Sequence, residues 1–311
     1  MAYDLKTINE NLRTDPKDYV AQCDLAYQEK IDTAIEKVCG NMKNSPVVLL
    51  SGPSGSGKTT SALKIEEGMK KRGIKTYTVS MDDYYKTVNP LTVPRTPEGD
   101  IDYESPDCID MELLDEHFTL LEQHREIQIP HFIFSRQKRS ASRFTPLKLG
   151  KNEIAIFEGI HALNDSITVK HPDAFKLYVS ARSNIIDGSE MLFKSTWMRL
   201  VRRVVRDNNF RGADAAFTLR LWGNVRRGEK LHISPFKHKA DFMLDSSLPY
   251  EVSLMKAFAM PLFENIPDGT ERIDELTHII PAFERFADLD PSFVQPESLL
   301  REFIGGGIYK Y

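Results

Sequence analysis

Residues 52–59 read Gly52-Pro53-Ser54-Gly55-Ser56-Gly57-Lys58-Thr59, and this stretch decides the fold. It fits the pattern G-x-x-x-x-G-K-[ST] of a phosphate-binding loop, and it lies between an apolar run at 46–50 and a helical pattern at 58–72. The glycines let backbone N–H groups turn toward a polyphosphate, and the start of the helix adds partial positive charge. Lys58 is expected to reach the β- and γ-phosphates, and Thr59 to offer its hydroxyl to Mg²⁺. The loop therefore predicts binding of a nucleoside triphosphate.

Strand and helix patterns alternate on both sides of this loop. Apolar or β-branched runs predict strands at residues 75–80, 127–133, 153–157, 174–179 and 241–244, and helical periodicity predicts helices at 15–38 and 111–124. Such alternation indicates a βαβ series. The expected fold is α/β: a three-layer phosphate-loop nucleoside triphosphate hydrolase type with an open parallel sheet and a helical lid. Residues 87–106 are rich in Pro, Gly and Asp and predict a long functional or mobile loop.

Composition excludes several other classes of protein. The 311 residues are 41% hydrophobic and 28% charged, as in globular domains, and the net charge of −4 gives no general case for binding nucleic acid or a membrane surface. The chain has neither a secretory leader pattern nor an apolar stretch of about 18 residues, so we expect a cytoplasmic protein. Cys23, Cys39 and Cys108 lack the spacing of a disulfide framework or zinc site and are expected to be reduced thiols.

Carboxylates follow two of the predicted strands. Asp82 and Asp83 come after the strand at 75–80, and Glu158 directly ends the apolar run at 153–157. Ligands of open α/β folds bind at this carboxyl edge of the sheet. A carboxylate there can accept a proton from a substrate hydroxyl or hold Mg²⁺, and Gly159 would permit a tight turn after Glu158. The alternatives are a helix cap for Asp82 or Asp83 and a loop-facing position without a ligand for Glu158.

Arginines recur at helical spacing further along the chain. Arg199, Arg202, Arg203 and Arg206 share one predicted helix face, and Arg211 follows them. We interpret them as lacking matching carboxylates, so that their mutual repulsion favours an anionic partner. Transferring phosphoryl groups are such a partner; nucleic acid or an acidic protein surface is the alternative.

With these pieces in order, the chain resembles the uridine kinase and phosphoribulokinase family of phosphate-loop kinases. The matching segments between residues 47 and 212 are GPSGSGKTT, SMDDYYK, YESPD, IQIP, IFEGIHAL and RLVRRVVRDNNFRG. LRLWGNVRRGEKLHISPFKHKADFMLDSSLPYE and SLLREFIGG resemble the uridine-kinase-like subgroup that is often fused to a threonyl-tRNA-synthetase-like region.

The resemblance implies a role for each matching residue. Asp82 would be the general base that takes the proton from a nucleoside 5′-hydroxyl, with Lys58 acting on the transferring phosphate. Thr59, Asp82 and Glu158 would attend the Mg²⁺ of ATP. The nucleotide would be bound by the segment that runs from Gly52 to Thr60 and by Arg206 and Arg211. Tyr85 and Glu104 would lie against the ribose, and Arg203 would reach the sugar. Homo-oligomers are common in the family, and its uridine kinases serve pyrimidine salvage.

The base pocket departs from the pattern of uridine kinases. Where those enzymes place a tyrosine and a histidine against the pyrimidine, this chain has Phe132 and Gln137, and a later glutamine position holds Leu221. Phe132 could stack on a ring, and Gln137 could bond to a base edge. The Arg-Gly-Arg of the lid reads Arg211-Gly212-Ala213. Such changes alter discrimination between substrates. The resemblance therefore supports the family's reaction more directly than it supports uridine as the acceptor.

Three functions remain open at this point. The leading hypothesis is an ATP-dependent kinase for the 5′-hydroxyl of a nucleoside such as uridine or cytidine. The second is a kinase for another alcohol, such as a sugar phosphate or a pantothenate-like compound, and the third is a catalytically silent ATP-binding regulatory module. We expect residues 1–44 to form a helical extension, 45–263 the kinase domain, and 264–311 a helical tail, broken at Pro267, Pro281, Pro291 and Pro296, that serves packing rather than catalysis.

Overall fold

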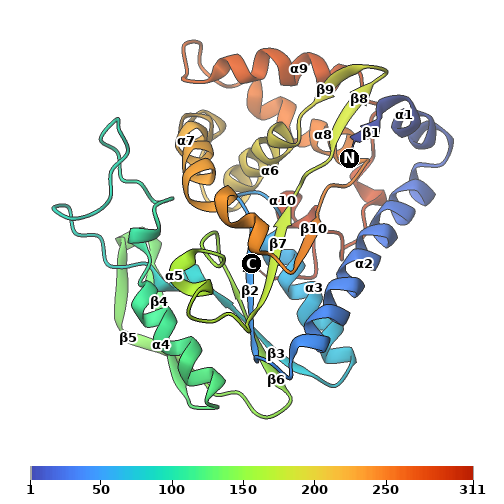
Figure 1. Cartoon of the computed structure of the whole chain (residues 1–311). Coiled ribbons are helices and arrows are strands. Elements are labelled where there is room, and N and C mark those ends of the chain that lie inside the picture. Colours follow the sequence, from blue (N-terminus) through green and yellow to red (C-terminus); the bar gives the residue numbers. More distant parts are fainter. Residues whose placement is uncertain (1, 311) are drawn as a thin grey trace.

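A five-stranded parallel sheet lies at the centre of the computed structural model, which describes residues 2–310 (Figure 1). The strand order is β10-β7-β2-β6-β3. The strands are β2 (Val47–Ser51), β3 (Lys75–Ser80), β6 (Glu153–Glu158), β7 (Phe175–Ser180) and β10 (Phe242–Asp245). This arrangement confirms the α/β fold with an open parallel sheet.

Helices cover both faces of this sheet because the strands are apolar on both sides. Val48 and Leu50 of β2 belong to one buried cluster, whereas Val47 and Leu49 belong to the other. Side chains of a strand alternate between faces, so a continuous apolar run serves two cores. Helices α2 (Pro16–Asn41) and α3 (Lys58–Lys71) lie on the first face, and α4 (Met111–Glu122) and the short α5 (Asp165–Thr168) lie on the second.

The register of the sheet sets the position of the candidate site. Glu158 at the end of β6 is paired with Leu50 of β2 on one side and with Ser80 of β3 on the other. The phosphate loop, Glu158 and the turn that carries Asp82 therefore leave the sheet at the same edge, as the sequence predicts.

One predicted strand lies outside the central sheet. β4 (Ile127–Ile133) pairs antiparallel with β5 (Lys138–Leu147), which the sequence analysis did not predict. β5 reads KRSASRFTPL and is largely exposed, so it gives no apolar signal. A further small sheet joins β1 (Ala2–Asp4), β8 (Asn184–Asp187) and β9 (Glu190–Phe193) beside α1 (Leu5–Thr14).

The C-terminal segment differs from its prediction at one proline. It follows α8 (Glu251–Phe263) and contains α9 (Leu276–Glu284) and α10 (Arg301–Ile304). The break expected at Pro281 is wrong, because α9 continues through it and buries Ile279 and Phe283. The division of the chain at residues 44 and 263 stays a prediction. The first residue of the N-terminal segment, Met1, and the last residue of the C-terminal segment, Tyr311, lie outside the described range. None of the helices within residues 2–310 is both long and apolar enough to cross a membrane.

Two of the arginines on α6 (Ser195–Phe210) are structural. Arg199 and Arg202 are buried, at 2% and 0% exposed. Arg199 Nη2 donates to Glu229 Oε2 at 2.8 Å, beyond α7 (Ala215–Gly228), and Arg202 Nη2 donates to Glu251 Oε2 at 2.6 Å. The interpretation that the arginines lack carboxylate partners is therefore wrong for these two, because their partners come from distant parts of the chain. It is also wrong for Arg203, which pairs with Asp207 four residues later.

The Arg202–Glu251 pair gives a stability prediction. We expect Glu251→Ala to lower the free energy of unfolding by about 3–5 kcal/mol, because the Arg202 charge would stay buried without its partner. Urea unfolding followed by circular dichroism measures this. The double variant Arg202→Met, Glu251→Leu should recover much of the loss, because it removes both charges. If Glu251→Ala lowered the free energy of unfolding by less than about 1 kcal/mol, this account of the buried pair would be wrong.

Candidate active site

The phosphate loop has a backbone that glycine makes possible. Gly55 and Gly57 have φ values of 72° and 78°, in the left-handed region that disfavours other residues. A Cβ on Gly52 would lie 2.0 Å from the carbonyl oxygen of Val179, so the loop starts in close contact with β7. The loop then enters α3 at Lys58, which places the first N–H groups of this helix at the edge of the sheet.

Three arginines of α6 donate hydrogen bonds to this loop. Arg199 Nη1 donates to the Ser54 carbonyl and Arg202 Nη1 to the Gly55 carbonyl, each at 3.2 Å. Arg203 Nη1 donates to Ser54 Oγ at 2.9 Å. Because these bonds engage carbonyl and hydroxyl oxygens, they fix the loop while leaving its N–H groups for another partner.

Glu158 lies beside the hydroxyl at the start of α3. Thr59 Oγ1 donates to Glu158 Oε1 at 3.3 Å, and Ser80 Oγ approaches the same oxygen at 3.5 Å. Burial raises the pKa of Glu158 to about 7, and nearby Lys58 opposes that rise. The following Gly159 serves close packing rather than a turn that needs positive φ, because a Cβ there would lie 2.6 Å from Met81 Cβ.

Asp82 and Lys58 face each other across one cavity. Burial raises the pKa of the Asp82 carboxyl, and the positive charges of Lys58 and Arg211 oppose the rise. Burial lowers the pKa of Lys58, and Glu158 and Asp82 oppose that effect. Ser80 caps the turn at Met81–Tyr84, so Asp82 does not act as its cap. Asp83 instead accepts a hydrogen bond from the Phe132 N–H at 3.2 Å and so ties the β4–β5 hairpin to this turn.

The cavity has a volume of about 250 Å³ and collects most of the predicted site residues. Those that line it are Ser54, Gly55, Ser56, Gly57, Lys58, Thr59, Asp82, Tyr85, Glu104, Glu158, Arg203, Arg206 and Arg211. Gly52 and Pro53 form the base of the loop, where the Pro53 carbonyl accepts a hydrogen bond from Lys58 Nζ at 3.3 Å. The cavity therefore brings together cations, carboxylates and the backbone of the phosphate loop from five parts of the chain.

Glu104 and Tyr85 lie at the Asp82 end of this cavity. Tyr85 Oη donates to the Tyr103 carbonyl at 2.9 Å, which holds the segment carrying Glu104 against the turn after β3. Burial raises the pKa of Glu104 to about 7, and Arg203 opposes the rise. Glu104 Oε2 is buried without a hydrogen-bond partner, whereas the buried Arg203 Nε lies 3.2 Å from Asp207 Oδ2. Since buried polar atoms are normally satisfied, Glu104 Oε2 is positioned to bind a polar ligand.

The residues predicted for a base pocket do not line the phosphate-loop cavity. Phe132 is buried and packs against Tyr85 and Phe134, with ring centroids 5.5 and 5.0 Å apart. Phe134, which the sequence analysis missed, lines the cavity in its place. Gln137 and Leu221 line a neighbouring cavity of about 990 Å³ that shares Tyr103, Glu104 and Arg203 with the first.

Asp207 organises the remaining arginines. Its carboxylate lies 3.2 Å from Arg203, 3.1 Å from Arg206 and 3.5 Å from Arg211. One buried carboxylate thus gathers three cations at the rim of the phosphate loop and leaves them with excess positive charge. Sequence analysis missed Asp207, although its position at i+4 from Arg203 is a usable signal.

The oxygen ligands at this edge fit a magnesium ion shared with phosphates. Mg²⁺ is usually held by one or two carboxylates and substrate phosphate oxygens. The Thr59 hydroxyl and the Glu158 carboxylate provide a partial shell of this kind beside the phosphate loop. Within residues 2–310, no group of three or more acidic, histidine or cysteine side chains forms a complete metal site.

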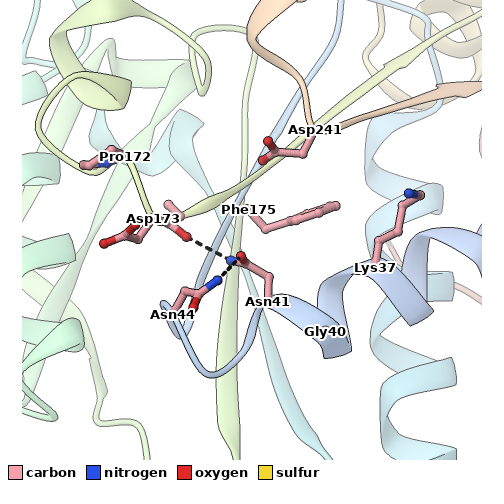
Figure 2. Close-up of a pocket in the computed structure, with 9 residues that line it drawn as sticks. Lys37, Gly40, Asn41, Asn44, Pro172, Asp173, Phe175 and Asp241 are labelled. Carbon is pink, nitrogen blue, oxygen red and sulfur yellow. Dashed lines mark hydrogen bonds between the residues drawn. The ribbon is translucent and has the colours of Figure 1, made fainter.

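A second hollow lies at the opposite edge of the sheet (Figure 2). It measures about 380 Å³ and lies beside the end of α2 and the starts of β7 and β10. Asn41 Nδ2 donates to the Asp173 carbonyl at 2.9 Å, and Asn44 Nδ2 donates to Asn41 Oδ1 at 3.0 Å. These polar groups join the loops to each other, and the hollow shares no residue with the phosphate-loop cavity.

Comparison with known proteins agrees with this geometry. The sequence model of the Phosphoribulokinase / Uridine kinase family matches residues 47–252. A uridine kinase of Schizosaccharomyces pombe is 32% identical over 165 residues, which cover 53% of this chain and 32% of that protein. A uridine kinase of Lactobacillus helveticus is 26% identical over 216 residues, covering 69% of this chain and 93% of that protein. The match thus spans about a third of the yeast protein and most of the bacterial one.

Solved structures give a distant likeness. One described as a possible uridine kinase from Bacillus stearothermophilus is 17% identical, has a TM-score of 0.45, and is matched over 70% of this chain and 98% of that chain.

Proposed function

Because this chain belongs to the phosphoribulokinase and uridine kinase family, we propose that it transfers the γ-phosphoryl group of ATP to the 5′-hydroxyl of a nucleoside such as uridine or cytidine. With those acceptors the reaction would be a cytoplasmic step of pyrimidine salvage. One observation carries the proposal: a single cavity holds Lys58, Thr59 and Glu158 of a phosphate site together with the carboxylate of Asp82.

Each residue has a role that follows from its place. Asp82 accepts the proton of the acceptor hydroxyl as the new bond to phosphorus forms. Lys58 and the loop N–H groups stabilise negative charge on the transferring phosphoryl group, and Arg206 and Arg211 add to this at the rim. Thr59 and Glu158 would hold Mg²⁺, which would neutralise phosphate charge.

The acceptor is held at the end of the cavity near Glu104. The unpaired Glu104 Oε2 and the Arg203 guanidinium would bond to sugar hydroxyls, and the Tyr85 ring would support the sugar. The neighbouring cavity of about 990 Å³ contains Arg220 and Arg272 at positions beyond Glu104. This favours testing a sugar phosphate as the second class of acceptor.

The test is Mg²⁺-dependent release of ADP from ATP with uridine, cytidine, purine nucleosides, ribose, ribose 5-phosphate and pantothenate as acceptors. Turnover highest with a pyrimidine nucleoside supports the proposal. Turnover only with the sugar phosphate or with pantothenate would contradict the nucleoside and favour the second class. ATP binding without turnover on any acceptor would instead favour a regulatory module.

Glu104 should give the reaction a pH dependence. Its carboxyl has a pKa of about 7 in the free protein, so it is protonated below that pH and ionised above it. We expect kcat/KM for the acceptor to fall about tenfold per pH unit below 7, because the protonated group no longer accepts bonds from two hydroxyls. Saturating Mg²⁺ and ATP should keep Glu158 ionised during the measurement.

Glu104→Gln is the matched variant for this pH profile. It should have a lower kcat/KM, and its kcat/KM should change less between pH 6 and pH 8, because the titrating group has been removed. A profile of the same shape in both proteins would show that Glu104 is not the group that titrates.

A further inference from the structure

The C-terminal segment brings a carboxylate to the phosphate-loop cavity. Glu302 lies on α10, is 7% exposed, and lines the phosphate-loop cavity together with Lys58 and Arg206. The sequence analysis assigned this segment to packing alone. The position of Glu302 corrects that expectation, because a nearly buried acid has entered a cavity built for phosphates.

Glu302 contacts groups that an anionic ligand would use. Thr60 Oγ1 donates to Glu302 Oε2 at 2.5 Å, and Arg206 Nη1 lies 3.9 Å from Glu302 Oε1. Thr60 is the third residue of α3 and so belongs to its first turn. The carboxylate therefore lies at the positive end of the helix dipole, where phosphate also binds favourably.

The backbone around Glu302 is firmly docked. A Cβ on Gly57 would lie 2.7 Å from Leu299 Cδ1, so this segment packs directly on the phosphate loop. The Arg202 guanidinium lies 5.2 Å from the centre of the Phe303 ring, and Asn209 Nδ2 donates to the Phe303 carbonyl at 3.2 Å. These contacts on both sides hold the Glu302 carboxylate at the loop.

We propose that Glu302 is an affinity-determining residue of the donor site, whose carboxylate lies against Arg206 in the free protein and competes with the polyphosphate for this cation. The inference rests on the proposed function in so far as the donor is ATP. The reason is electrostatic: two anionic groups that need the same cation and the same helix end repel each other. Binding of the polyphosphate therefore weakens the contact of α10 with the loop.

The first test is binding of Mg-ATP without acceptor, measured by calorimetry on the full chain. Glu302→Gln keeps an oxygen that can accept from Thr60 but removes the charge. We expect its Kd for ATP to fall at least about tenfold, because a repelling charge is lost. Glu297→Gln is the matched control, since Glu297 is an exposed acid of the same segment outside this cavity. Its Kd should equal that of the wild type.

The second test uses the wild type alone and so does not depend on how the variant folds. Amide hydrogen exchange of residues 299–304 should become faster when Mg-ATP binds, because Glu302 loses its partners. Unchanged or weaker ATP affinity in Glu302→Gln, or slower exchange of these amides with ATP, would overturn the inference. Failure of the wild type to bind ATP at all would overturn the proposed function as well, and this outcome is distinct from the other two.

Discussion

Asp82→Asn is expected to lower kcat by roughly 10²–10⁴-fold, the contribution of a general base to proton transfer. The amide has the size of the carboxylate but cannot take the proton of the acceptor hydroxyl. Because Asp82 lies on the turn after β3 and not in the phosphate loop, the variant should still bind Mg-ATP with a Kd close to that of the wild type. The kcat is measured from initial rates of ADP release at saturating substrates, and the Kd for Mg-ATP is measured by calorimetry.

Asp83→Asn is the control for this variant. Asp83 is the next residue, but its carboxylate accepts from the Phe132 N–H, and an asparagine oxygen can do the same. We expect its kcat to stay within a few-fold of the wild type. Equal losses in the two variants would show that the turn is sensitive to any change of charge, and the assignment of Asp82 as the base would be wrong.

Lys58→Met should lower kcat about 10²–10³-fold, the usual cost of losing one group that stabilises transition-state charge. It should also weaken ATP binding, unlike Asp82→Asn, because Lys58 belongs to the phosphate loop itself. The KM for ATP and its Kd by calorimetry would record the second effect.

Lys71→Met is the matched control on the same helix. Lys71 lies at the far end of α3, is exposed, and pairs with Glu67 at 2.8 Å. Kinetics like those of the wild type are expected for this variant. Normal ATP binding and turnover in Lys58→Met would instead refute the assignment of the phosphate loop as the donor site.

The central sheet could be predicted because its signals are local. A short apolar run followed by a glycine-rich turn and a helical pattern identifies β2, the loop and α3 from adjacent residues alone. The same reasoning predicted Asp82 and Glu158 at one edge, since parallel strands end together. β5 escaped prediction because its ten residues are mostly polar and exposed, so nothing in its pattern distinguishes it from a loop.

The carboxylate partners could not be predicted because they come from distant parts of the chain. Arg202 pairs with Glu251, 49 residues away, and Thr60 with Glu302, 242 residues away. Helical spacing reports which arginines share a face, but it does not report what that face packs against. The same limit applies to Phe134, which reaches the cavity only because β4 turns into the hairpin with β5.

The most direct test of the central claim is transfer of labelled phosphate from [γ-³²P]ATP to uridine, with the product identified by ³¹P NMR. Purified wild type with Mg²⁺ is predicted to yield uridine 5′-monophosphate, and Asp82→Asn to yield almost none while it still binds ATP. Wild-type protein that binds Mg-ATP but transfers no label to uridine, cytidine or any other alcohol of the acceptor panel would contradict the account.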